Sequence, residues 1–149
     1  MRELKFDLIY KGETGFHHKK YYIDELMTGI NRICDIHNIM VLIAKRQYTG
    51  LKDKNGKEIY EGDVISFSWK EQEEKDVIGH FRSPVVFERG SFVFRFASNV
   101  LNFSRMNNDG SILWKDYFSV MSDVYYEIFN IEAIGNIYEN PELINWRKL

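Results

Sequence analysis

The chain has little of several features that define common protein classes. Its single cysteine, Cys34, excludes an intramolecular disulfide and agrees with a reducing cytosol. No apolar run approaches the ~18 residues that a membrane-spanning helix needs. The net charge of −2 lacks the basic excess of a tight DNA-binding protein. We therefore expect a cytoplasmic protein that makes no membrane contact.

Aromatic residues are abundant instead, while prolines number only two. The 149 residues include eleven Phe, nine Tyr and three Trp, and such side chains favour pleated β surfaces. A chain of this length is most naturally one domain and buries roughly 68–70% of its unfolded surface. We expect a mainly β fold, with α+β character only at its margins, that needs no metal or cofactor to form.

Period-two alternation predicts strands in two segments, residues 63–69 and 91–97. The apolar residues that share a face are Ile65, Phe67 and Trp69 in the first segment and Phe92, Phe94 and Phe96 in the second. Residues 2–10 alternate less cleanly, and 125–134 is a mixed strand that ends at Gly135, a candidate bulge. Turn residues at 88–90 and 107–110, and a charged loop at 70–76, separate these strands.

Two segments carry helical signals. Apolar spacing over 23–36 favours a helix, but Gly29 and the β-branched run that follows favour a strand, so both alternatives stay open. At the end of the chain, Asn140 can cap a helix and Pro141 suits its first position. We expect a short helical tail over 140–149.

The stretch 48–65, YTGLKDKNGKEIYEGDVI, predicts a hairpin around Asn55-Gly56. A two-residue turn would oppose like charges, Lys54 with Lys57. A three-residue loop gives the favourable pairs Asp53–Lys57, Lys52–Glu58 and Leu51–Ile59. In that register Gly56 takes the left-handed position that closes the loop. The charges of this stretch are thereby explained by strand pairing.

Gly50 and Gly62 bracket the hairpin as sharp corners. Asp63 can accept hydrogen bonds from nearby backbone amides, as Asp often does in turns. A Glu-Gly-Asp turn followed by a β-branched strand is typical of small SH3-like barrels. The stretch is therefore interpreted as scaffold, not as a site.

Three segments together resemble the YopX family of phage and prophage proteins. They are residues 47–65, the start MRELKF at 1–6, and the closing IEAIGNIYENPEL at 131–143. The residues of this signature are Tyr48, Gly50, Leu51, Asn55, Gly56, Ile59, Tyr60, Gly62, Asp63, Gly135, Tyr138 and Pro141. Residues 7–46 and 70–125 match the family pattern poorly.

The resemblance implies a mainly β, two-lobed single domain over 1–149. Its N-terminal lobe would span about 1–47 and its SH3-like, barrel-type C-terminal lobe about 48–143. It implies an uncharacterised accessory protein of phages or prophages of Gram-positive bacteria, and it carries no established activity and no catalytic residue.

Candidate sites for chemistry are weak. The histidines His17, His18, His37 and His80, with Cys34, lack metal-ligand spacing, because neighbours on a strand point to opposite faces. Cys34 and His37 lack a third group to complete a nucleophilic set. The acidic run Glu71, Glu73, Glu74 and Asp76 lacks the glycine-centred loop of a calcium site. No Gly-Lys-Ser/Thr follows the glycines of the hairpin, so a phosphate cradle is not indicated. We expect no catalytic, cofactor-binding or metal-binding residues.

Two interaction roles remain. The aromatic surplus and the edge strands of a β-rich lobe favour protein–protein contact, with self-association and an unknown phage or host protein as partners. The alternative is weak nucleic-acid binding through aromatic and basic side chains on one face. Its candidate residues are Lys45, Arg46, Lys52, Lys54, Trp69, Phe81, Arg82, Arg89 and Arg95.

Overall fold

The computed structural model describes residues 4–22, 40–73, 75–96, 99–115 and 125–148. The segment 23–36, for which helix and strand both stayed open, lies outside these ranges, as do Cys34 and His37. The described residues form strands and short 3₁₀ helices, so the mainly β class is confirmed.

The strands and 3₁₀ helices of the described residues follow one another along the chain. In order, they are β1 (Lys5–Gly12), β2 (Gly15–Tyr22), β3 (Val41–Lys52), β4 (Glu58–Tyr60), β5 (Asp63–Glu71), β6 (Gly79–Pro84), β7 (Val86–Glu88), β8 (Ser91–Phe96), β9 (Asn99–Asn102), η1 (Phe103–Arg105), β10 (Ile112–Lys115), β11 (Tyr125–Asn136) and η2 (Pro141–Lys148).

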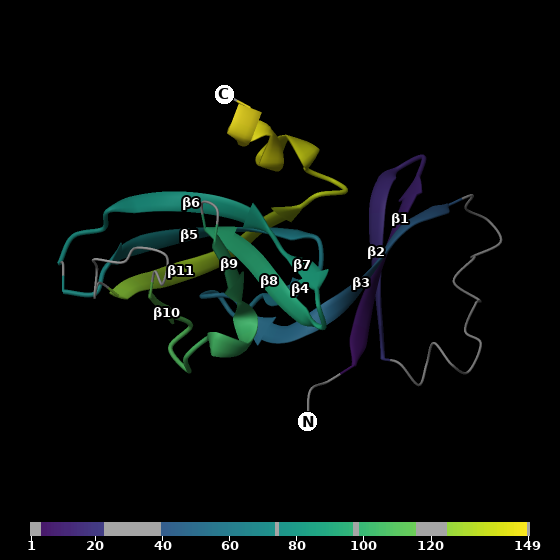
Figure 1. The fold of residues 1–149 in the computed structure, drawn as a ribbon. Helices are drawn as coiled ribbons and strands as arrows, with labels where there is room; N and C mark the ends of the chain where they lie inside the picture. The colour runs from purple at the N-terminus through teal and green to yellow at the C-terminus, as the bar shows by residue number, and fades with distance from the viewer. Residues whose placement is uncertain (1–3, 23–39, 74, 97–98, 116–124, 149) are drawn as a thin grey trace.

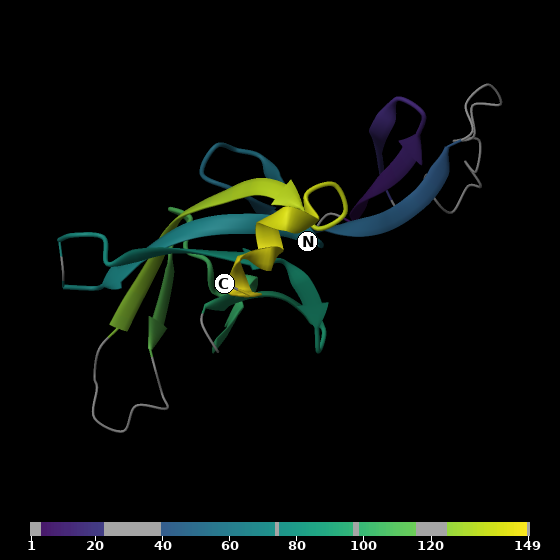
Figure 2. The same ribbon diagram turned by 90° about the horizontal axis from the view of Figure 1, so that it is seen from above.

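The described strands pair into three antiparallel sheets, ordered β2-β1-β3-β4, β10-β11-β5-β6 and β7-β8-β9. They do not close into one barrel ring, which differs from the predicted barrel-type lobe. Strand β3 runs through both lobes: its first half pairs with β1 and its second half with β4. Figures 1 and 2 show the N-terminal strands projecting to one side of the C-terminal lobe.

The C-terminal lobe is built around aromatic rings. Phe67 and Phe94 lie at its centre, with ring centroids 5.2 Å apart, and Phe94 also contacts Phe103 at 4.8 Å. The strand predicted over 91–97 is present as β8 (Ser91–Phe96), with Phe92, Phe94 and Phe96 buried as expected, but Val93 is buried as well, so β8 does not have a single buried face. The burial of many rings supplies the main driving force for folding this lobe.

The N-terminal lobe has a much smaller apolar cluster. Leu8, Tyr10 and Tyr21 are buried together, with Met40 packed against them. The β1–β2 hairpin pairs in full register from Lys5–Tyr22 to Gly12–Gly15. A lobe with so few buried side chains depends on contacts with its neighbour for its position.

The predicted three-residue loop at 54–56 is confirmed. Lys52 pairs with Glu58, the Asp53 amide donates to the Lys57 carbonyl at 2.8 Å, and Gly56 has a φ of 81°. The Leu51–Ile59 pair was wrong, since the ladder shifts between Tyr48–Tyr60 and Lys52–Glu58 and residues 49–51 bulge against Ile59. The Thr49 hydroxyl donates to the Ile59 carbonyl at 2.7 Å inside this bulge.

The hairpin tip is fastened to β11. Asp53 accepts hydrogen bonds from the amides of Asn55 and Lys57, each at 2.9 Å, and from the Ala133 amide at 3.0 Å. The Lys54 amide donates to the Ile131 carbonyl at 2.9 Å. Glu58 faces Lys52 across the ladder as predicted, but its carboxylate contacts Lys5 and Lys20 of the N-terminal lobe.

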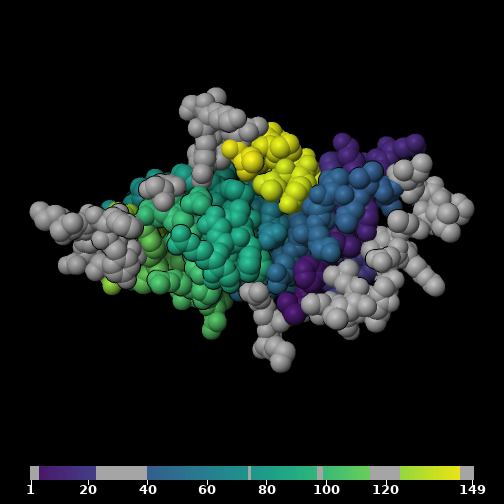
Figure 3. All heavy atoms as spheres, turned by 45° about the vertical axis from the view of Figure 1, so that its right-hand side comes forward, coloured from purple at the N-terminus to yellow at the C-terminus, as the bar shows by residue number. Residues whose placement is uncertain are grey.

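The C-terminal tail forms the 3₁₀ helix η2, which starts at Pro141 as predicted. The Asn140 side chain does not cap η2; its Oδ1 accepts from the Asn136 amide at 3.3 Å. The predicted bulge at Gly135 is confirmed by a register shift between β11 and β5. In Figure 3 the tail, in yellow, lies over the place where the two lobes meet.

Candidate functional site at the junction of the two lobes

A cavity of about 390 Å³ lies where the N-terminal lobe meets the C-terminal lobe. Its walls come from β1, β2 and β3 on one side and from β4, β5, β11 and the turn after β11 on the other. We call it the junction cavity. Sites for small molecules occur preferentially at such interfaces between structural units.

Arg46 is the central side chain of the junction cavity and is 4% exposed. Its Nη2 and Nε donate to Asp7 Oδ2 of β1 at 2.6 and 3.2 Å, and its Nη1 donates to Asp63 Oδ1 of β5. Burial alone would lower the pKa of the guanidinium, but Asp63 and Asp7 raise that pKa above its usual value. One buried cation thus joins three strands.

Asp63 accepts on its other oxygen from the Tyr60 amide at 2.8 Å, which confirms the predicted contact with a nearby backbone amide. Burial raises the pKa of Asp63, against the attraction of Arg46 and the Tyr60 amide, which lower it. The corner before it requires glycine: Gly62 has a φ of 84°, and an added Cβ would lie 2.9 Å from Tyr138 Cε2.

His18 connects β2 to the turn that follows β11. Its Nδ1 lies 2.8 Å from Asp7 Oδ2 and its Nε2 lies 2.9 Å from Glu139 Oε2. The Asn136 carboxamide donates to the same Glu139 oxygen. His18 is therefore a strand residue held between two carboxylates.

Glu58 forms a second charged group in the cavity wall. Burial raises the pKa of Glu58, but hydrogen bonds from Lys5 and Lys20 more than offset this and hold the pKa below its usual value. Burial and the nearby Glu58 charge raise the pKa of Tyr60. Among the described residues, four of the five groups with a shifted pKa line this cavity. Such clustering is a feature of functional sites and of structural ion networks alike.

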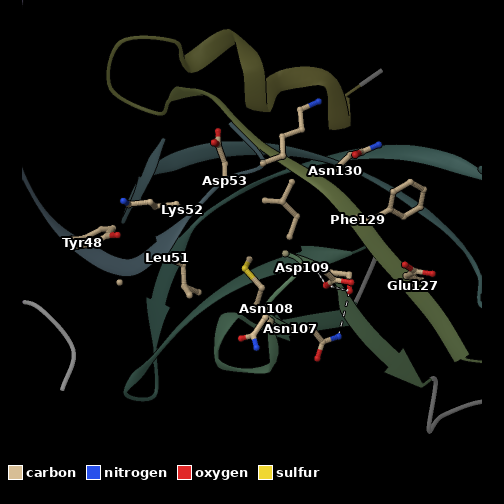
Figure 4. Close-up of a pocket in the computed structure, with 16 residues that line it drawn as sticks. Tyr48, Leu51, Lys52, Asp53, Asn107, Asn108, Asp109, Glu127, Phe129 and Asn130 are labelled. Atoms are coloured by element: carbon tan, nitrogen blue, oxygen red, sulfur yellow. Dashed lines mark hydrogen bonds between the residues drawn. The ribbon is translucent and has the colours of Figure 1, made fainter. Parts of the chain in front are cut away.

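A second cavity, of about 670 Å³, lies between the hairpin loop, the turn 106–111 and β11 (Figure 4). The polar groups of the turn 106–111 bond to one another: Asp109 Oδ1 accepts hydrogen bonds from the Ser111 amide and hydroxyl at 3.0 and 2.6 Å. These bonds lower the pKa of Asp109. The junction cavity, which holds buried charges, is the stronger candidate site.

The nucleic-acid candidates do not all remain available as surface contacts. Arg46 is buried in ion pairs, Lys54 pairs with Glu132 at 3.4 Å, and Arg95 pairs with Glu88 at 2.9 Å. The exposed candidates are Lys45, Lys52, Lys54, Arg82 and Arg89, while Trp69 and Phe81 pack against the aromatic core.

Two of the histidine candidates for a metal site bond to hydroxyl side chains. His17 bonds to Thr14, and His80 bonds to Ser68. The part of the chain that the structure describes contains no cluster of three or more His, Cys, Asp or Glu side chains placed to hold a metal ion. The role of Asp7 was missed in the sequence, because its partners Arg46 and His18 come from two other strands, β3 and β2.

Comparisons with known proteins identify a family. The family model described as YopX protein matches residues 5–145. Neither the curated proteins nor the solved structures include a match. Among the described residues, no helix is long and apolar enough to cross a membrane.

Proposed function

The chain belongs to the YopX family, and we propose that it is a non-enzymatic interaction module of phages or prophages that self-associates through the outer edge of β3. By outer edge we mean residues 41–45 on the side of β3 that faces away from β1. The proposal rests on the chemistry and exposure of this edge.

Three consecutive apolar side chains are exposed at the start of β3. Val41 is 60% exposed, Leu42 47% and Ile43 38%. Exposed single hydrophobic residues are ordinary, but a contiguous run on a strand is a feature of contact surfaces. This run is the single observation that carries the proposal.

The backbone at this edge supports the same role. Among the described strands, β3 has β1 on one side and β4 on the other, and β4 reaches β3 only between Tyr48 and Lys52. The opposite edge strand, β2, carries exposed Lys19 and Lys20, which discourage strand pairing. Over residues 41–45 the outer edge of β3 carries a single cation, Lys45, beside the exposed Val41, Leu42 and Ile43.

A second copy of the chain is the occupant that fits best. Antiparallel pairing centred on Ile43 would place Lys45 opposite Val41 and Ala44 opposite Leu42, so no like charges would face each other. The bulge between the Ile9–Ala44 and Tyr10–Leu42 pairs limits the length of β3 that can pair regularly with a second copy. We therefore expect side-chain packing to contribute as much as backbone hydrogen bonds.

Light scattering on a sizing column, across a dilution series, tests the proposal. We expect a homo-oligomer for the natural chain and the 17.8 kDa monomer for Leu42→Lys. Val100→Lys is the matched control, because Val100 has the same 47% exposure on β9. A monomer of the natural chain at every concentration would refute self-association. Equal dissociation by both substitutions would refute the β3 edge as the interface.

A further inference from the structure

One buried acceptor in the junction cavity lacks a donor. Asp7 is 1% exposed, and its Oδ2 receives all the hydrogen bonds of the side chain, from Arg46 and His18. Within the described part of the chain, Oδ1 has no hydrogen-bond partner. A buried carboxylate oxygen without a donor is unfavourable, so this atom marks a place where a donor group would bind.

The charges around Asp7 select the kind of donor. The cavity is lined by four carboxylates, from Asp7, Glu58, Asp63 and Glu139, and by three cationic side chains, from Lys20, Arg46 and Lys57. Arg46 is already shared between Asp7 and Asp63, and Lys20 is engaged by Glu58. An anion would meet the free lone pairs of Asp7 Oδ1, so a cationic N–H donor suits the cavity best.

We propose that the junction cavity binds a small organic cation whose ammonium or guanidinium group donates a hydrogen bond to Asp7 Oδ1. A cavity of about 390 Å³ is large enough for a compound of this kind. This site is separate from the β3 edge, and its test does not depend on self-association.

His18 competes with such a ligand. It occupies Asp7 Oδ2 and Glu139 Oε2, and its side chain is 35% exposed, whereas Asp7 Oδ1 is closed to solvent. Binding at Oδ1 therefore requires the cavity wall to open beside Asp7, and the partly exposed His18, which contacts Oδ2 of the same carboxylate, is the side chain whose movement would open it. Removal of His18 should therefore strengthen binding, which is the opposite of what loss of a binding residue would do.

The test is an NMR titration of the full chain with propylammonium chloride, following the amides of Asn136, Glu139 and Asn140. Tetramethylammonium chloride, which has the same charge but no N–H, is the matched control compound. We expect saturable shifts with propylammonium only. His18→Ala should bind at least several-fold more tightly, and Asp7→Asn about tenfold or more weakly, as loss of a charged hydrogen bond requires.

Further variants protect the test from a folding artefact. Glu139→Gln should also weaken binding, because it removes a second carboxylate from the wall. Glu132→Gln, on the exposed part of β11 by the hairpin, should bind like the natural chain. If Asp7→Asn does not fold, unchanged affinity in both His18→Ala and Glu139→Gln overturns the proposal. Equal shifts from the two ammonium salts, or no saturable shift in the natural chain, overturn it as well.

Discussion

In the C-terminal lobe, rings of Phe and Trp fill the space between the sheets, whereas the N-terminal lobe meets its neighbour through buried charges. Phe67 and Phe94 lie in an aromatic cluster that draws on both sheets of that lobe. At the junction, Arg46 bonds Asp7 and Asp63, and His18 bonds Asp7 and Glu139. The two regions therefore depend on different forces.

This difference indicates which structural property each kind of contact determines. Apolar packing is strong but tolerant of small rotations, because its attraction has little direction. A guanidinium fork fixes the angle at which two carboxylates approach it. We expect the aromatic core to supply most of the stability and the Arg46 network to set the orientation of the N-terminal lobe.

The largest effect is expected in the aromatic core. Phe94→Ala should lower the free energy of unfolding by about 3–5 kcal/mol, because the fully buried ring leaves a cavity. Urea denaturation followed by tryptophan fluorescence measures the loss. Phe87→Ala, at a ring that is 45% exposed, is the control and should cost much less. Similar losses for the two variants would contradict the importance of this core.

A comparable but qualitatively different loss is expected at the junction. Arg46→Met should cost about 3–5 kcal/mol, since it leaves two buried carboxylates without their cation. In this variant Asp63 would lose the attraction of Arg46, so its burial would favour the protonated carboxyl and raise its pKa. We expect the two lobes then to unfold in separate steps, which hydrogen exchange can resolve. A single cooperative transition would argue against an orienting role.

The two glycines of the hairpin region separate backbone strain from crowding. Gly62→Ala should cost about 1–3 kcal/mol, because strain from its φ of 84° adds to the contact with Tyr138. Gly56→Ala should cost only about 1 kcal/mol, because its φ is 81° but nothing lies within 4 Å of an added Cβ. Thermal unfolding of both variants checks the order, and equal losses would assign the effect to strain alone.

The smallest effect is expected in how stability depends on acidic pH. The pKa of Glu58 is depressed in the folded chain, so its contribution is present above the unfolded pKa of about 4.5 and is lost as the pH falls through the lower folded value. Glu58→Gln should therefore reduce stability at neutral pH and flatten its decline on acidification. Urea midpoints measured across this range test the sign, and an unchanged acid dependence would reject it.

Local signals made part of this fold predictable. The Asn55-Gly56 turn, the burial of Phe92, Phe94 and Phe96 and the start of η2 at Pro141 each depend on residues close in the sequence. The hairpin β1–β2 was missed because β2 is polar on most of its length, so GFHHKKYY shows no apolar alternation. Exposed strands of this kind give little periodic signal.

The junction could not be predicted for a different reason. Asp7, Arg46 and Asp63 belong to three strands, and their meeting depends on the registers of two ladders. The same limit explains Glu58, which was assigned to Lys52 across the hairpin but bonds to Lys5 and Lys20. Matching charges within one hairpin cannot show that a side chain bonds instead to a residue of a different strand.

The position of β11 has a consequence for how the protein is made. It comes after all the other described strands in the sequence, yet it pairs between β10 and β5 inside its sheet and receives the hairpin tip at Ile131 and Ala133. The Ile137 amide also bonds to the Gly62 carbonyl at 2.9 Å. Since synthesis proceeds at about 5–20 residues per second, the earlier strands must wait several seconds without their central neighbour. A nascent chain stalled before residue 125 should therefore stay sensitive to protease across both lobes, until synthesis resumes and β11 can enter its sheet.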